Sequence, residues 1–134
     1  MTQNRVTWVD RTLILAPCYI GLCLSEDAFN KELKRLKLKD PPAWVSESAD
    51  ATTHQFQDSK HNDCIIVCLN ANRKAFSYEQ VMALLVHEAV HIWQNIKEII
   101  NEPIPSHEFE AYAIQGISQE LICAYRDMKK KGKK

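Results

Sequence analysis

Five consecutive residues, His87 to His91, read HEAVH and contain the side-chain types that hold and use a metal ion. Residues four apart on a helix lie on the same face, so His87 and His91 can present two imidazoles to one ion. Glu88 lies about 100° round the helix from His87, within reach of a water molecule held by that ion. The spacing therefore predicts two metal ligands and a neighbouring general base on one helix.

The segment around HEAVH has the signals of a long helix. Ser77 and Gln80 form a capping-box pattern directly before an apolar run, which predicts a helix over about 78–99. The run is apolar on nearly all sides, so we expect this helix to lie at the domain centre with both histidines in the core. Two buried imidazoles and a carboxylate need partners there, and a metal ion serves them better than scattered backbone carbonyls. H-E-x-x-H on such a helix is the arrangement of zinc hydrolases.

A catalytic zinc site usually has three protein ligands and keeps one position open for water. Gln94 and Lys97 stand where the three-histidine extension of the motif needs glycine and histidine, which excludes that class. A second helix is expected after Ser106, an N-cap residue, to about residue 128, and Glu108 and Glu110 lie in its first turn. These two carboxylates point about 200° apart, so only one can face the ion. The alternative for both is that they complement the helix dipole.

The order of these features resembles the gluzincin class of zinc peptidases, in particular its small single-domain members and the ImmA/IrrE-like and HtpX-like peptidases. In these the helix after H-E-x-x-H carries E-x-x-A followed by Asp or Asn, and EFEAY, residues 108–112, is the matching stretch here. The resemblance covers about residues 60–125. It implies Glu108 as the third ligand, although Glu110 with Ala113 also satisfies a bare E-x-x-A.

Tyr112 departs from this family pattern, because the family often has an Asp or Asn there that orients a zinc-bound histidine. Tyr112, Gln115 or His107 would have to supply that hydrogen bond instead. Tyr112 and His107 are also the nearby candidates for stabilising an oxyanion. The departure leaves open an alternative, a catalytically inactive zinc-binding domain that acts through a protein partner. A small helical interaction domain without metal is the second alternative.

The resemblance implies a zinc-dependent peptidase or related amide hydrolase, with Zn²⁺ as cofactor and a peptide or protein as substrate. His87, His91 and Glu108 would hold the ion, and Glu88 would take a proton from its water and pass it to the leaving amine. In related enzymes the substrate lies extended along an edge strand beside the active-site helix. Here that strand would come from residues 43–69.

The remaining patterns predict an α+β fold in one domain over residues 1–128, and the resemblance implies that this domain is zincin-like. One or two short strands fit residues 6–24, and an amphipathic helix over about 26–38 follows Ser25. Two or three antiparallel strands fit the segments AWVSE, ATTHQFQ and CIIVCLN, so the short sheet is expected to be mostly antiparallel. The Lys-rich end, residues 129–134, is expected to be a disordered tail.

The composition limits the class of protein, its main partners and its cellular location. A chain of 134 residues with 46% apolar and 25% charged residues is typical of one soluble globular domain. The formal net charge is zero and no basic patch is interleaved with aromatics, which disfavours nucleic acid as the main partner. No apolar run nears twenty residues and no signal-peptide pattern occurs, so we expect no membrane partner and a cytoplasmic location. Nothing in the sequence indicates the oligomeric state.

The sequence predicts structural roles, rather than metal binding, for the cysteines and for His54 and His61. Five cysteines without a C-x-x-C pair indicate reduced thiols, mostly buried as small hydrophobic groups. Cys64 and Cys68 share one face of a strand but are too far apart along it for a zinc knuckle. His54 and His61 are interpreted as surface or hydrogen-bonded histidines rather than ligands.

Overall fold

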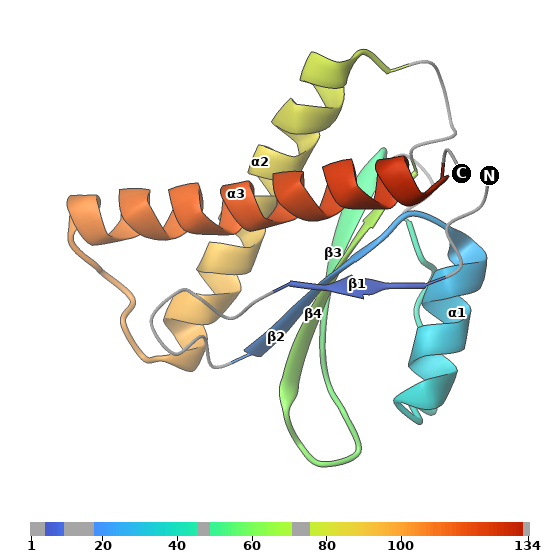
Figure 1. The fold of residues 1–134 in the computed structure, drawn as a ribbon. Coiled ribbons are helices and arrows are strands. Elements are labelled where there is room, and N and C mark those ends of the chain that lie inside the picture. Colours follow the sequence, from blue (N-terminus) through green and yellow to red (C-terminus); the bar gives the residue numbers. More distant parts are fainter. Residues whose placement is uncertain (1–4, 10–17, 46–48, 71–75, 133–134) are drawn as a thin grey trace.

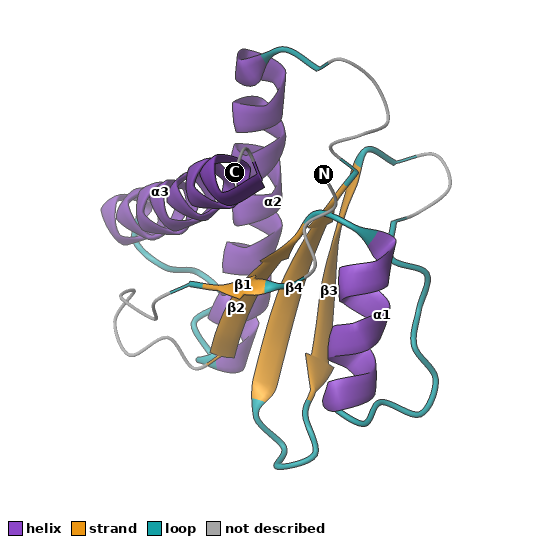
Figure 2. Cartoon of the chain, turned by 45° about the vertical axis from the view of Figure 1, so that its right-hand side comes forward, coloured by secondary structure: helices purple, strands orange, loops and turns teal. Residues whose placement is uncertain are grey.

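The chain folds into a small sheet with helices on both faces (Figures 1 and 2). The computed structural model describes residues 5–9, 18–45, 49–70 and 76–132, and within them the α+β class is confirmed. The elements in chain order are β1 (Thr7–Trp8), β2 (Cys18–Cys23), α1 (Glu26–Arg35), β3 (Ala51–Gln57), β4 (Asp63–Leu69), α2 (Tyr78–Ile99) and α3 (His107–Gly132).

The four described strands form one mixed sheet in the order β1-β2-β4-β3. The β1–β2 and β3–β4 pairs are antiparallel, as predicted for most of the sheet, and the β2–β4 pair is parallel. The central strand β4 is apolar on both faces, because the sheet is covered on both sides. Among the described strands β3 pairs with β4 alone, so β3 forms one edge of the sheet next to α2.

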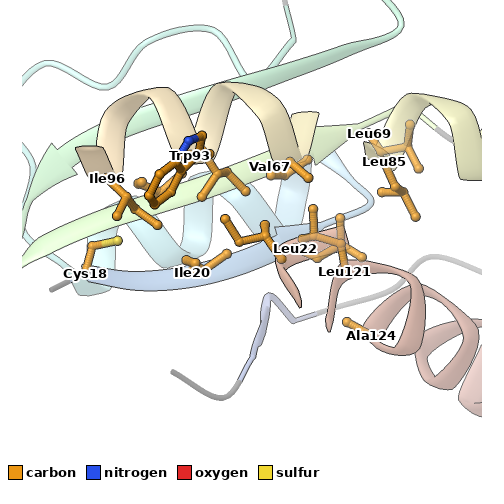
Figure 3. Close-up of a cluster of buried hydrophobic side chains, with 14 of the residues drawn as sticks. Cys18, Ile20, Leu22, Val67, Leu69, Leu85, Trp93, Ile96, Leu121 and Ala124 are labelled. Carbon is orange, nitrogen blue, oxygen red and sulfur yellow. The ribbon is translucent and has the colours of Figure 1, made fainter. Parts of the chain in front are cut away.

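Two hydrophobic cores lie on the two faces of this sheet. The larger one joins β2 and β4 to α2 and α3, and Figure 3 shows Trp93, Val67 and Leu121 among its side chains. The smaller one lies between the sheet and α1, with Phe29, Ile66 and the thiols of Cys23 and Cys68 among its buried members. Because the larger core is apolar and close-packed, it holds α2 firmly against the sheet and α3.

Helix α1 is shorter than predicted, and it ends at Arg35 instead of near residue 38. Lys37 adopts a left-handed conformation with φ of 60°, and the amides of Lys37 and Leu38 bond back to the carbonyls of Lys34 and Leu33. This pattern is a Schellman motif, which satisfies the last carbonyls and stops the helix before the prolines at 41 and 42. The predicted cap is confirmed, since the Ser25 hydroxyl accepts the Ala28 N–H at 3.2 Å.

Two other predictions about the fold need correction. The segment AWVSE forms no strand at residues 43–45, and the rest of the prediction, at 46–48, lies outside the described residues. The expected disordered tail is wrong for residues 129–132, because α3 continues to Gly132. Met128 is buried in the core and the Lys129 ammonium lies 5.6 Å from the Tyr125 ring centre, so side-chain contacts favour the last turns. Residues 133–134 lie outside the described part.

In the described part of the chain, no helix is both long enough and apolar enough to cross a membrane.

Candidate metal centre

Helix α2 positions the HEAVH motif, and it begins and ends at the predicted residues, Tyr78 and Ile99. Its first turn has the predicted capping box. The Ser77 hydroxyl accepts the Gln80 N–H at 3.1 Å, and the Gln80 side-chain oxygen accepts the Ser77 N–H at 2.8 Å. The backbone N–H groups of Ser77 and Gln80, which have no carbonyl partner within the helix, are therefore both hydrogen-bonded. These bonds fix where the helix starts and which way each later side chain points.

The two histidines are exposed, so the prediction that they lie in the core is wrong. Ala89 is fully buried at the centre of the α2 face that packs into the larger core. His87 and His91 each lie two residues from Ala89, which places them about 200° round the helix, on the opposite side. An apolar composition nearly all round the helix does not reveal which side lacks a packing neighbour, and here it is the side with the histidines.

The imidazoles of His87 and His91 converge although both are exposed. Their Nε2 atoms lie 3.2 Å apart, and the rings meet edge to face with centres 4.9 Å apart. Two nitrogen ligands at the usual zinc distance in a tetrahedral site are separated by about 3.3 Å. The pair therefore fits the first two ligand positions around one ion with little movement of either side chain.

Gln94 orients one member of this pair. Its side-chain oxygen lies 3.0 Å from Nδ1 of His91. An amide oxygen only accepts hydrogen bonds, so Nδ1 of His91 carries the proton and its Nε2 accepts the hydrogen bond from Nε2 of His87. A metal ion would take the place of that shared proton and bind the same Nε2 lone pair. Sequence reasoning considered Tyr112, Gln115 and His107 for this orienting role and missed Gln94. The signal was available, because Gln94 is three residues after His91 and so lies on the same face.

Glu88 is buried, with 4% of its surface exposed, and the Thr53 hydroxyl donates a hydrogen bond to its Oε2. Thr53 belongs to the edge strand β3, so this contact joins the motif helix to the sheet edge. A buried carboxylate is costly unless it is hydrogen-bonded, and Thr53 supplies that bond. The predicted base therefore lies at the junction of α2 and β3, on the helix stripe next to the histidines.

The two candidate carboxylates of α3 have different surroundings. Glu110 contacts α2, because its Oε2 accepts a 2.8 Å hydrogen bond from Nε1 of Trp93 and lies 3.6 Å from Nζ of Lys97. The Trp93 hydrogen bond, with smaller contributions from Lys97 and His107, holds the pKa of the Glu110 carboxyl below its usual value. Glu108 is exposed. Of the two, Glu110 is the one whose carboxylate lies against the helix that carries the histidines.

In the described part of the chain, no third metal ligand lies beside His87 and His91. Within the described ranges, no three His, Cys, Asp or Glu side chains are arranged so that they could hold a metal ion together. Glu108 as the third ligand, with Glu110 as its alternative, stays a prediction. Tyr112 and His107 are both exposed in the first two turns of α3, and their predicted roles also stay open.

His54 is hydrogen-bonded and His61 lies at the surface, as the sequence indicated, and most of the cysteines are buried. His54 Nε2 lies 3.0 Å from the Trp44 carbonyl oxygen and its ring stacks against Phe29, so His54 is hydrogen-bonded. His61 is exposed, in a turn with φ of 64°. All five cysteines are free thiols and four are buried. Burial, with the charges of Asp58 and Asp63, raises the pKa of Cys64 to about 11.

No protein-family model, curated protein or solved structure matches this chain. Its function has to be argued from the contacts of its own residues, and the resemblance to gluzincins stays a prediction.

Proposed function

We propose that this protein is a zinc-dependent peptidase or related amide hydrolase with a small zincin-like fold. The observation that carries the proposal is the convergence of two imidazole Nε2 atoms, 3.2 Å apart, at HEAVH. Gln94 holds the His91 proton on Nδ1, away from Nε2, and Glu88 lies on the adjoining stripe of the same helix. The five free thiols suit a reducing compartment, so we place the protein in the cytoplasm.

Each residue has a separate task in this proposal. His87 and His91 hold the ion through Nε2. Zn²⁺ in such a site polarises the scissile carbonyl and makes water a nucleophile near neutral pH. Glu88 accepts a proton from the attacking water and delivers it to the leaving nitrogen as the C–N bond breaks. The Thr53 hydroxyl fixes the Glu88 carboxylate, so that its free oxygen is held in one direction.

For the third ligand we propose Glu108, as the family pattern implies, with Glu110 as the alternative. The Glu110 carboxylate is already held at Trp93 and Lys97, and Trp93 lies on the buried face of α2, about 200° round the helix from His91. An ionised oxygen ligand is what zinc requires at this position. Glu108 is exposed in the first turn of α3, so its carboxylate would be the one that turns toward the ion.

Edge strand β3 is where the substrate would lie. Its outer edge is not paired with another described strand, and Thr53 on β3 contacts the proposed base directly. An extended peptide can add to such an edge through main-chain hydrogen bonds. That pairing would place a peptide carbonyl beside Glu88 and the two histidines.

The proposal is tested by zinc content and hydrolysis on the same protein samples. We expect about one zinc per chain in the wild type, lost in His87→Ala and His91→Ala and retained in Glu88→Gln. Wild-type protein should cleave members of a mixed peptide library followed by mass spectrometry, and Glu88→Gln should lower the rate at least about a hundredfold. Glu79→Gln, an exposed Glu in the first turn of α2, is the matched control.

The outcomes separate the rival functions. Stoichiometric zinc without hydrolysis by the wild type would favour a zinc-binding domain that acts through a partner. A wild-type protein that binds no zinc would overturn the proposal.

A further inference from the structure

Two buried cysteines contact each other on the face of the sheet that α1 covers, and the proposed chemistry uses neither of them. Cys23 ends β2 and Cys68 lies near the end of β4, and the two residues are register partners in the parallel β2–β4 pair. Both side chains belong to the smaller core and are fully buried. Their thiols are hydrogen-bonded to each other. The fold therefore brings together two thiols that are far apart in the sequence.

The spacing of the two strands lets these thiols form a disulfide. Neighbouring strands lie about 4.8 Å apart, and residues opposite each other in the register have their Cα atoms at about that separation. A disulfide needs Cα atoms about 4.4–6.8 Å apart. Cys23 and Cys68 also point to the same side of the sheet, because both belong to the smaller core. The bond can therefore form with little movement of either strand.

The hydrogen bonds around the pair make Cys23 the more acidic thiol. The Cys23 S–H donates to the Ser25 carbonyl oxygen at 3.1 Å, so its sulfur accepts the hydrogen bond from the Cys68 thiol. That hydrogen bond lowers the pKa of Cys23, against the effect of burial. Burial raises the pKa of Cys68, with further contributions from Cys23 and Glu88. Cys23 is therefore the thiol that more readily becomes a nucleophilic thiolate, and Cys68 stays protonated beside it.

We propose that Cys23 and Cys68 are an oxidation site, at which a peroxide converts the two thiols into a disulfide. The Cys23 sulfur attacks one peroxide oxygen, the O–O bond breaks, and the other oxygen takes up the thiol proton and leaves as water or an alcohol. Cys23 is then a sulfenic acid. The Cys68 sulfur displaces its hydroxyl group, which leaves as water with the Cys68 proton, and the S–S bond forms. One peroxide thus accepts the two electrons that the two thiols lose.

Helix α1 controls the access of the peroxide to the pair. It covers this face of the sheet (Figure 2), and its Phe29 and Leu33 are buried in the same cluster as the two thiols. The helix has only 10 residues, so it can open locally while the larger core on the other face stays packed. The rate of oxidation should therefore depend on how often α1 opens.

Oxidation is tested on the full chain carrying Cys123→Ser. Among the five described cysteines Cys123 alone is partly exposed, so its removal prevents disulfides between molecules. We expect hydrogen peroxide to lower the mass of this protein by two hydrogen atoms, and dithiothreitol to restore it. Peptide mapping without reduction should show the peptides that contain Cys23 and Cys68 joined to each other. This readout needs no change at either residue, so it does not depend on how their variants fold.

Variants in this background make the result specific. Cys23→Ser and Cys68→Ser should each abolish the loss of two hydrogen atoms. Cys64→Ser, which removes another buried thiol of β4, is the matched control and should retain it. Leu33→Ala removes apolar packing between α1 and the sheet, so it should speed disulfide formation about tenfold or more. Lys34→Ala, at an exposed position of α1, should leave the rate unchanged.

Three results would overturn the inference. The first is that both residues stay free thiols under peroxide while the methionines of the same protein are oxidised. The others are a disulfide that links different cysteines, and a sulfinic acid at Cys23 without any disulfide. Zinc content and peptide hydrolysis are separate measurements, so each of these results leaves the hydrolase proposal as it stands.

Discussion

The indole Nε1 of Trp93 donates a 2.8 Å hydrogen bond to Oε2 of Glu110, which joins the start of α3 to α2 two residues beyond His91. The Phe109 ring packs against the same indole, with ring centres 5.5 Å apart. Trp93 itself is almost fully buried in the larger core. A buried indole thus holds a carboxylate of α3 against the helix that carries the two histidines.

Exchanging each carboxylate of α3 separately should identify the third zinc ligand. We expect Glu108→Gln to weaken zinc binding by about tenfold or more, because an amide is a much poorer ligand than a carboxylate. Glu110→Gln should bind zinc like the wild type. Trp93→Phe keeps the Glu110 carboxylate and removes only its hydrogen bond, so it should lower stability and preserve zinc affinity. Loss of zinc in Glu110→Gln alone would make Glu110 the third ligand instead.

Acid should destabilise the metal-free protein through Glu110. Its folded-state pKa is lowered by the Trp93 hydrogen bond and by Lys97 and His107, so the contribution is present above the ordinary carboxyl pKa. That contribution is lost as the pH falls through the lower folded-state pKa. Urea unfolding of wild type and Glu110→Gln from pH 6 to pH 2 should show the difference between them shrinking on acidification. A difference that stays constant with pH would contradict the ionised pairing.

Gln94 should support zinc binding without being a ligand. We expect Gln94→Ala to weaken zinc affinity about 10- to 100-fold, because His91 loses the acceptor that holds its proton on Nδ1. Competition with a chromogenic chelator measures the change. Gln115→Ala, another exposed glutamine that the sequence suggested for the same role, is the control and should match the wild type. Equal losses in both variants would show that the effect is not specific to His91.

The Thr53 hydroxyl should stabilise the fold through Glu88. Thr53→Val removes the donor from a buried carboxylate, and we expect the free energy of unfolding to fall by about 1–3 kcal/mol. Thr53→Ser keeps the hydroxyl and should recover part of the loss. A double-mutant cycle with Glu88→Gln, followed by urea unfolding, should give a coupling energy, since both side chains belong to one contact. An additive cycle would mean that the hydrogen bond does not form in solution.

The sequence alone determined the elements whose signals are local. Ser77 and Gln80 bond to each other across one turn, so the pattern was sufficient to locate the start of α2. The β-branched and aromatic residues of ATTHQFQ predicted strand β3 with the observed bounds, 51–57. Such features need only residues a few positions apart, which is why they can be identified without knowing the fold. The spacing of His87 and His91 likewise followed from helix geometry alone.

Only the tertiary structure decided which groups surround that motif. Packing of Ala89 against the sheet turned His87 and His91 outward, although the helix is apolar on almost every side. The partners of Glu88 and Glu110 are Thr53 and Trp93, which are 35 and 17 residues away along the chain. Contacts over such separations depend on how the sheet and helices pack together, and no local pattern encodes them. The same packing placed Glu110, rather than Glu108, against the helix that carries the histidines.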